Sequence, residues 1–133
     1  MSIRDNFESY RRKLIGITLQ EHGAKRIRET FPELSEDDVK STPPSIHGAD
    51  LQLSEKASTA LGHPSFEMKS DKSRFKSLYK AIAQAKRQAQ IHENPIVVLT
   101  DHSDDQAEPL AVMDFEKWLI FSRLMYEQLM KEK

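Results

Sequence analysis

The chain has 133 residues, of which 38% are hydrophobic and 31% charged, and this composition is typical of a folded protein rather than a disordered one. The net charge is −1, so charge alone predicts no affinity for nucleic acid or membranes. The absence of cysteine excludes disulfides, thiolate zinc sites and cysteine nucleophiles. We expect a single cytoplasmic domain over residues 1–133, because the N-terminus is too polar for a signal peptide and no apolar run is long enough to span a membrane.

A long helix is predicted at the start of the chain. Apolar residues recur near helical spacing over residues 5–30, although Gly16 and Gly23 lie inside this pattern, and Phe31-Pro32 ends it. Residues 29–38 are predicted to form a solvated loop or cap, because they carry five acids and no base. Residues 41–48 are predicted to form a rigid loop, because they contain two adjacent prolines.

The rest of the chain predicts four strands and two further long helices. The strands are expected at residues 49–53, 65–69, 96–100 and 109–113, and the third of them is expected to be buried. The helices are expected at 75–91 and 114–131, and a short helical turn over 54–61 is predicted to have Ser54 as its N-cap and Gly62 as its stop. The order α-β-β-α-β-β-α predicts an α/β (α+β) fold with a mixed central sheet of about four strands flanked by helices.

Three charged residues of the first two predicted strands form a pattern with chemical meaning. Asp50 lies in the first strand, and Glu67 and Lys69 lie two residues apart in the second. Because side chains alternate along a strand, Glu67 and Lys69 are expected on one face and Met68 on the other. If the strands pair, Asp50 lies beside Glu67, and two carboxylates suit Mg²⁺ or Mn²⁺. A neighbouring lysine orients water and stabilises charge on a phosphate, so the pattern fits phosphodiester hydrolysis. The same pattern also describes the solvent face of an edge strand.

Several further stretches occur in the order found in a known family of nucleases. They are Gly48 to Ser54, Phe66 to Lys69, Leu78 to Ala85 and Ile96 to Leu99. With them the sequence resembles the small PD-(D/E)XK nucleases, especially the short phage-type and Holliday junction resolvase-like members, over about residues 25–121. The resemblance implies a restriction-endonuclease-like core and a metal-dependent endonuclease that acts on branched DNA. Ala49 stands where the proline of the family's name would be, a position that supplies no metal ligand.

The resemblance also implies a role for each matching residue of the two strands. Asp50 and Glu67 would ligate Mg²⁺ or Mn²⁺ together with the backbone carbonyl of Met68. Lys69 would position or activate the attacking water.

Residues outside the two strands complete the site that the resemblance implies. Gln84 would orient the catalytic groups or contact the substrate, and Glu8 matches the acidic residue often found on the first helix, with Glu21 and Glu29 as alternatives. His47 lies in the loop before Asp50, where it either contacts the substrate or is an ordinary exposed loop residue.

Basic residues cluster in the part of the chain that follows the Glu-x-Lys pattern. Residues 69–90 contain seven lysines and arginines and one acid, which indicates a surface for DNA phosphates or else a solvated helix face. The expected DNA contacts are Lys72, Arg74, Lys76, Lys80, Lys86 and Arg87. The apolar stripe of the same helix is assigned to Phe75, Leu78, Tyr79, Ile82, Ala85 and Ala89.

The C-terminal helix, within residues 115–133, has more apolar surface than one packed face needs. Phe121, Leu124, Met125 and Leu129 either form a homodimer interface or are buried in the monomer. The sequence therefore predicts a dimeric DNA endonuclease that does not bind membranes. Two alternatives remain: a nuclease for linear or single-stranded DNA, and a nuclease-fold protein that binds DNA without cleaving it.

Overall fold

The computed structural model describes the backbone of residues 3–133 and the side chains of residues 15–133. Its elements are α1 (Ile3–Thr30), β1 (Val39–Ser41), β2 (Leu51–Leu53), α2 (Glu55–Leu61), α3 (Lys76–Gln88), β3 (Val97–Leu99), β4 (Leu110–Val112) and α4 (Phe115–Lys131). This confirms the α+β class, with the order α-β-β-α-α-β-β-α. Within the described part of the chain, no helix is both long and apolar enough to cross a membrane.

The strands form two separate antiparallel pairs, so the prediction of one mixed central sheet is wrong for the described residues. In the first pair Val39 lies opposite Leu53, and in the second Val97 lies opposite Val112. The predicted strand at 65–69 does not form, and β1 appears instead where two predicted loops meet. The sequence did not predict β1, because acidic residues precede it and indicated an exposed loop. In the structure Val39 of this strand is fully buried.

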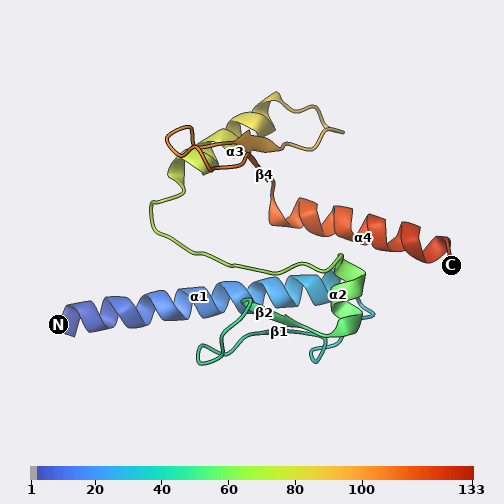
Figure 1. The fold of residues 1–133 in the computed structure, drawn as a ribbon, viewed down its shortest axis with the longest axis horizontal. Coiled ribbons are helices and arrows are strands. Elements are labelled where there is room, and N and C mark those ends of the chain that lie inside the picture. Colours follow the sequence, from blue (N-terminus) through green and yellow to red (C-terminus); the bar gives the residue numbers. More distant parts are fainter. Residues whose placement is uncertain (1–2) are drawn as a thin grey trace. The chain divides into compact units, whose positions relative to one another are not determined.

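By its contacts the chain divides into two compact units, of which the first comprises Met1–Ser70 and Phe121–Lys133. Figure 1 shows the β1–β2 pair beside the C-terminal half of α1, with α2 at the end of β2. The buried apolar residues of this unit come from α1, the segment after it, the strands and α2: Ala24, Ile27, Phe31, Leu34, Val39, Leu51, Ala57 and Leu61. The helix α1 continues through Gly16 and Gly23 without a break, because packing of its apolar face outweighs the low helix propensity of glycine.

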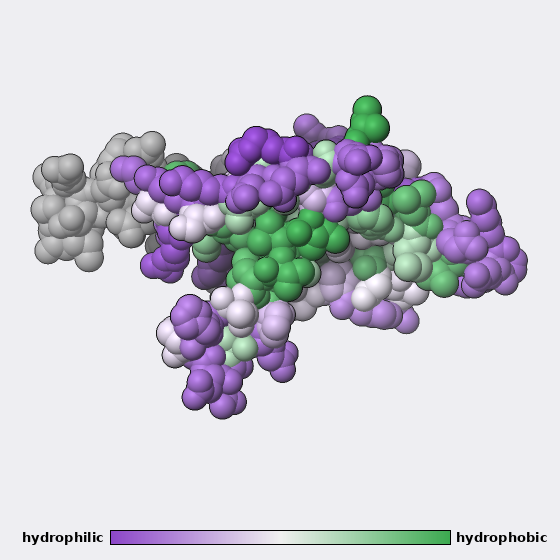
Figure 2. Space-filling view, turned by 90° about the horizontal axis from the view of Figure 1, so that it is seen from above, coloured by the Kyte–Doolittle hydropathy of each residue, from purple (hydrophilic) through white to green (hydrophobic). Residues whose placement is uncertain are grey.

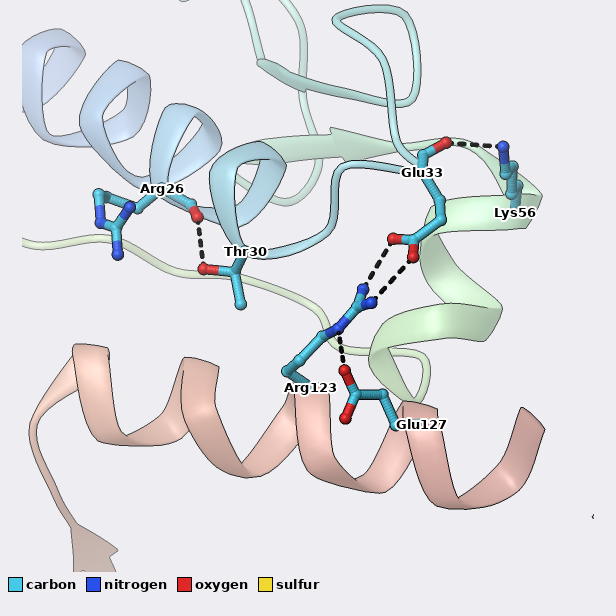
Figure 3. Close-up of polar contacts among 6 residues, drawn as sticks. All are labelled: Arg26, Thr30, Glu33, Lys56, Arg123 and Glu127. Carbon is cyan, nitrogen blue, oxygen red and sulfur yellow. Dashed lines mark hydrogen bonds and ion pairs between the residues drawn. The ribbon is translucent and has the colours of Figure 1, made fainter. Parts of the chain in front are cut away.

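Polar contacts around Arg123 tie the C-terminal part of α4 into the first unit. Its guanidinium donates two hydrogen bonds to the carboxylate of Glu33, at 2.7 and 2.9 Å, and a third to Glu127 at 2.9 Å (Figure 3). It also lies 5.5 Å from the ring centre of Phe31 and 5.3 Å from that of Tyr126. The two parallel hydrogen bonds to one carboxylate require a specific geometry, and the position of the guanidinium over two rings adds cation–π attraction.

The short helix α2 confirms the predicted caps. The Ser54 hydroxyl accepts a hydrogen bond from the Ala57 N–H at 3.1 Å, and Gly62 ends the helix with φ of 81°. Ser54 also donates to the Asp38 carboxylate at 2.7 Å, which links α2 to the turn before β1. The capping residue thus holds together two segments that are distant in sequence.

The second unit comprises Asp71–Ile120, in which α3 packs against β3. Ile82 is the buried residue of α3, and Lys86 forms an ion pair with Asp114 at 2.8 Å. Two predictions are wrong here. Val98 of β3 is 70% exposed although this strand was expected to be buried, and Tyr79 is 73% exposed although it was assigned to the apolar stripe of its helix.

The apolar residues of α4 remain largely open to solvent. Phe121, Leu124, Met125 and Leu129 are all exposed, so the alternative in which they are buried in the monomer is wrong. In Figure 2, hydrophobic side chains lie on the surface toward the C-terminal end of the chain, next to its hydrophilic tip at the right. The homodimer stays a prediction.

Candidate functional site

Asp50 lies directly beside the Glu-x-Lys segment, although the two do not form a sheet. The Asp50 N–H donates to the Phe66 carbonyl at 2.8 Å, and the Met68 N–H donates to Asp50 Oδ2 at 2.5 Å. The second bond crosses 18 positions in the sequence and joins a carboxylate to backbone. Asp50 is therefore bonded to the residues on either side of Glu67, through its backbone N–H to Phe66 and through its carboxylate to Met68.

Glu67 and Lys69 point away from the protein and toward each other. Their side chains are 65% and 71% exposed, and Lys69 Nζ lies 3.1 Å from Glu67 Oε1. Phe66 and Met68, between and beside them, are partly buried. The predicted alternation of the segment is therefore confirmed, with the two charged side chains on one face.

Met68 fastens this segment to α1 at Gly23. A Cβ atom built on Gly23 would lie 2.5 Å from Met68 Cε and 3.5 Å from Met68 Sδ. Ordinary carbon–carbon contacts lie near 3.5–4.0 Å, so the thioether fills the space that a larger residue would occupy. Glycine in the middle of this helix lets the Glu-x-Lys segment approach α1 closely.

The loop before Asp50 is closed by hydrogen bonds from the buried residue Thr42. Its N–H donates to the Asp50 carbonyl at 3.0 Å, and its hydroxyl donates to the Ala49 carbonyl at 2.6 Å. Gly48 has φ of +131°, a conformation that residues with a side chain rarely adopt. Together with the bonds to Phe66 and Met68, these contacts engage the backbone N–H, the carbonyl and the carboxylate of Asp50.

The oxygen atoms at this position suit a divalent cation of the Mg²⁺ type. Asp50 and Glu67 supply carboxylates, and Met68 supplies a backbone carbonyl. The described residues contain no group of three or more His, Cys, Asp and Glu side chains placed to share a metal. Two carboxylates are enough for Mg²⁺, which keeps several waters and takes further ligands from substrate phosphates. The ligand types of Asp50, Glu67 and Met68 therefore match those that the predicted ion takes.

Of the remaining predicted catalytic residues, those with described side chains make no hydrogen bond or ion pair with this group. The side chain of Glu8 lies outside the described residues. Of its alternatives, Glu29 forms ion pairs with Lys25 at 3.8 Å and Arg26 at 2.6 Å. Glu21 is exposed and two positions from Gly23, which puts it on the opposite side of α1. Gln84 is exposed on α3 in the second unit.

The cations predicted to contact DNA are exposed, but only some are free of acidic partners. Arg74 lies 3.8 Å from Asp71, and Lys86 pairs with Asp114. Among the described carboxylates, none forms an ion pair with the other predicted cations, which are Lys72, Lys76, Lys80 and Arg87. His47 is exposed in the loop before Gly48. The four unpaired cations can therefore contact phosphates without first breaking a salt bridge.

A hollow of the first unit lies elsewhere. An open groove of about 800 Å³ is bounded by α2 and the C-terminal part of α4, with Leu34, Ala60, Tyr126 and Met130 on its walls. None of the predicted catalytic residues with a described side chain lines it, so the Asp50 group lies outside this groove.

Sequence reasoning missed two residues that hold the Asp50 group together, Gly23 and Thr42. Glycine inside a helix pattern was a signal for a close approach at Gly23, whereas nothing marked Thr42 as the residue that closes the loop. In comparisons with known proteins, no family model, curated protein or solved structure matched this chain.

Proposed function

We propose that this protein is a metal-dependent DNA endonuclease that hydrolyses phosphodiester bonds and prefers branched DNA. The observation that carries the proposal is the hydrogen bond from the Met68 N–H to the Asp50 carboxylate, because it unites the aspartate with the Glu-x-Lys segment. From the resemblance to PD-(D/E)XK nucleases we keep this local arrangement of a restriction-endonuclease-like core, without its central sheet.

Each residue of the group has a defined task in this proposal. Asp50, Glu67 and the carbonyl of Met68 hold Mg²⁺ or Mn²⁺. When bound, the ion supplies Lewis-acid polarisation of the phosphodiester. Lys69, which lies beside Glu67, donates hydrogen bonds to the attacking water and offsets the negative charge that grows on the phosphate.

Exposed cations of the second unit bind the DNA. Lys72, Lys76, Lys80 and Arg87 contact phosphates and position the polymer without reading its sequence, with Arg74, Gln84 and His47 as further contacts. A homodimer formed through the exposed apolar residues of α4 would present two sites to the two-fold symmetry of a four-way junction. A DNA substrate and the lack of cysteine are compatible with the cytoplasm.

The test is a cleavage assay at low salt with Mg²⁺ or Mn²⁺. Labelled four-way junction, flap, linear duplex and single strand are compared for the wild type, Asp50→Asn and the control Asp105→Asn, which changes an exposed acid of the loop between β3 and β4. We expect paired nicks on the junction from the wild type and the control but not from Asp50→Asn. Equal cleavage of all substrates would keep the nuclease and remove the branch preference. Tight, salt-sensitive binding without cleavage would instead support a non-catalytic DNA-binding protein.

A direct measurement of metal binding separates a failed reaction from a missing ion. Mn²⁺ is titrated into the protein and the free ion is followed by electron paramagnetic resonance. We expect Asp50→Asn and Glu67→Gln each to weaken binding, because each removes one of two anionic ligands, whereas Asp105→Asn should leave it unchanged. Equal affinity in all four proteins would refute the metal site.

A further inference from the structure

We propose that Tyr79 on α3 is a stacking platform for an unpaired base, so that the DNA bound by this helix contains a single-stranded segment. The inference rests on the proposed function for the identity of the polymer as DNA. Its starting point is the unusual exposure of this tyrosine, whose side chain is 73% open to solvent. Among the described residues the side chain of Tyr79 makes no ring contact and no hydrogen bond, so its ring is free to receive a partner.

The residues around Tyr79 on α3 are positively charged and therefore favour a polyanion as the partner. The helix α3 contains four cations and no acid. Successive residues of a helix are turned by about 100°, so one side of α3, a sector of about 100° that begins at Tyr79, contains the following residues: Lys76, Lys80, Ala83 and Arg87. Lys76, Lys80 and Arg87 have no described carboxylate as an ion-pair partner, and the small side chain of Ala83, one turn beyond Tyr79, leaves the ring uncovered.

The dimensions of this face match a short length of one strand. Lys76 and Arg87 are eleven residues apart, which is about 16 Å along the helix axis. This distance covers a few nucleotides of a single strand, near the lower end of the sites of about 4–16 nucleotides that single-strand binding folds use. An exposed aromatic ring among such cations is the combination used by proteins that bind single strands, because any base can stack on the ring while lysine and arginine hold the backbone. A fully paired duplex keeps its bases inside the stack and offers no partner to Tyr79.

The test measures binding in the presence of a chelator, which separates it from cleavage. Fluorescence anisotropy is recorded with a labelled oligothymidine and with a matched duplex for the wild type, Tyr79→Ala, Tyr79→Phe, Lys80→Ala and Lys40→Ala. Lys40 is an exposed cation of β1 that forms no ion pair with the described residues and serves as the charge control. Circular dichroism verifies that each variant is folded.

We expect Tyr79→Ala to weaken single-strand binding by about ten- to a hundredfold and to leave duplex binding within twofold. Tyr79→Phe should restore affinity, because stacking needs the ring and not the hydroxyl. Lys80→Ala should lower the slope of log affinity against log salt by about 0.7, and Lys40→Ala should not. Unchanged single-strand affinity in Tyr79→Ala, or an equal loss for duplex, would overturn the inference. Loss confined to single strands in a protein that fails to cleave would keep the inference and refute the endonuclease.

Discussion

The contact between Met68 and α1 gives the sharpest test of how the Glu-x-Lys segment is held. Gly16 and Gly23 lie in the same helix, and replacing either by alanine removes the same unfavourable glycine, a gain of about 0.5–1 kcal/mol. A Cβ on Gly16 meets nothing within 4 Å. We therefore expect Gly16→Ala to stabilise the protein by the full amount.

Gly23→Ala should stabilise the protein less, because its Cβ would lie 2.5 Å from Met68 Cε. The thioether end is flexible and can rotate away, but a displaced or off-rotamer side chain costs about 0.5–1.5 kcal/mol. This cancels most or all of the propensity gain. In a Met68→Ala background the obstacle is gone, and both glycine substitutions should then give the same stabilisation.

The assay is urea unfolding followed by circular dichroism on a double-mutant cycle. With a slope of about 1–3 kcal/mol per molar urea, a difference of 1 kcal/mol moves the midpoint by roughly 0.3–1 M, which is easily resolved. We expect a coupling of about 0.5–1.5 kcal/mol between Gly23 and Met68 and none between Gly16 and Met68. Equal midpoints for Gly16→Ala and Gly23→Ala with Met68 present would refute the packing of this segment on α1.

Two further predictions concern α4. The hydrogen bonds from Arg123 lower the pKa of Glu33, so its stabilising contribution is present above the unfolded-state pKa of about 4.3 and is lost as the pH falls through the lower folded-state pKa. Melting temperatures measured between neutral and acid pH should therefore fall less steeply for Glu33→Gln than for the wild type, and an identical acid limb in both would contradict the pairing. If the exposed side of α4 forms the homodimer, Leu124→Glu should reduce the mass in light scattering from twice 15.3 kDa to 15.3 kDa, whereas Glu36→Gln, outside that helix, should not; a wild type that is already monomeric would refute the dimer.

The helices could be predicted from the sequence because their signals are local. The cap of Ser54 and the stop at Gly62 were correct, since capping depends on a side chain and the backbone within the same turn. The exposure of Tyr79 was not predictable, because it lies only 100° around the helix from Leu78, at the edge of the apolar stripe. Which side of that edge is covered depends on the elements packed against α3, and the helix pattern does not contain that information.

The strands show where local pattern stops being sufficient. Alternation at 65–69 correctly predicted which side chains face outward, because any extended chain alternates. It did not predict pairing, which needs a partner with free N–H and C=O groups in register. The partner that β2 takes is β1, so the predicted second strand keeps only isolated bonds to Asp50. The local neighbourhood of the candidate site was predictable, whereas its sheet was not.

The bond between Met68 and Asp50 also determines which variants of the site can be interpreted. One carboxylate oxygen of Asp50 accepts the Met68 N–H, so the residue both orders the segment and supplies charge. Asparagine keeps an oxygen acceptor for that N–H and removes the charge, whereas alanine removes both and leaves a partly buried N–H without a partner, at about 1–3 kcal/mol. Loss of metal affinity in Asp50→Asn with unchanged stability therefore reports on the ligand. The same loss in Asp50→Ala would mix ligation with misplacement of Glu67 and Lys69.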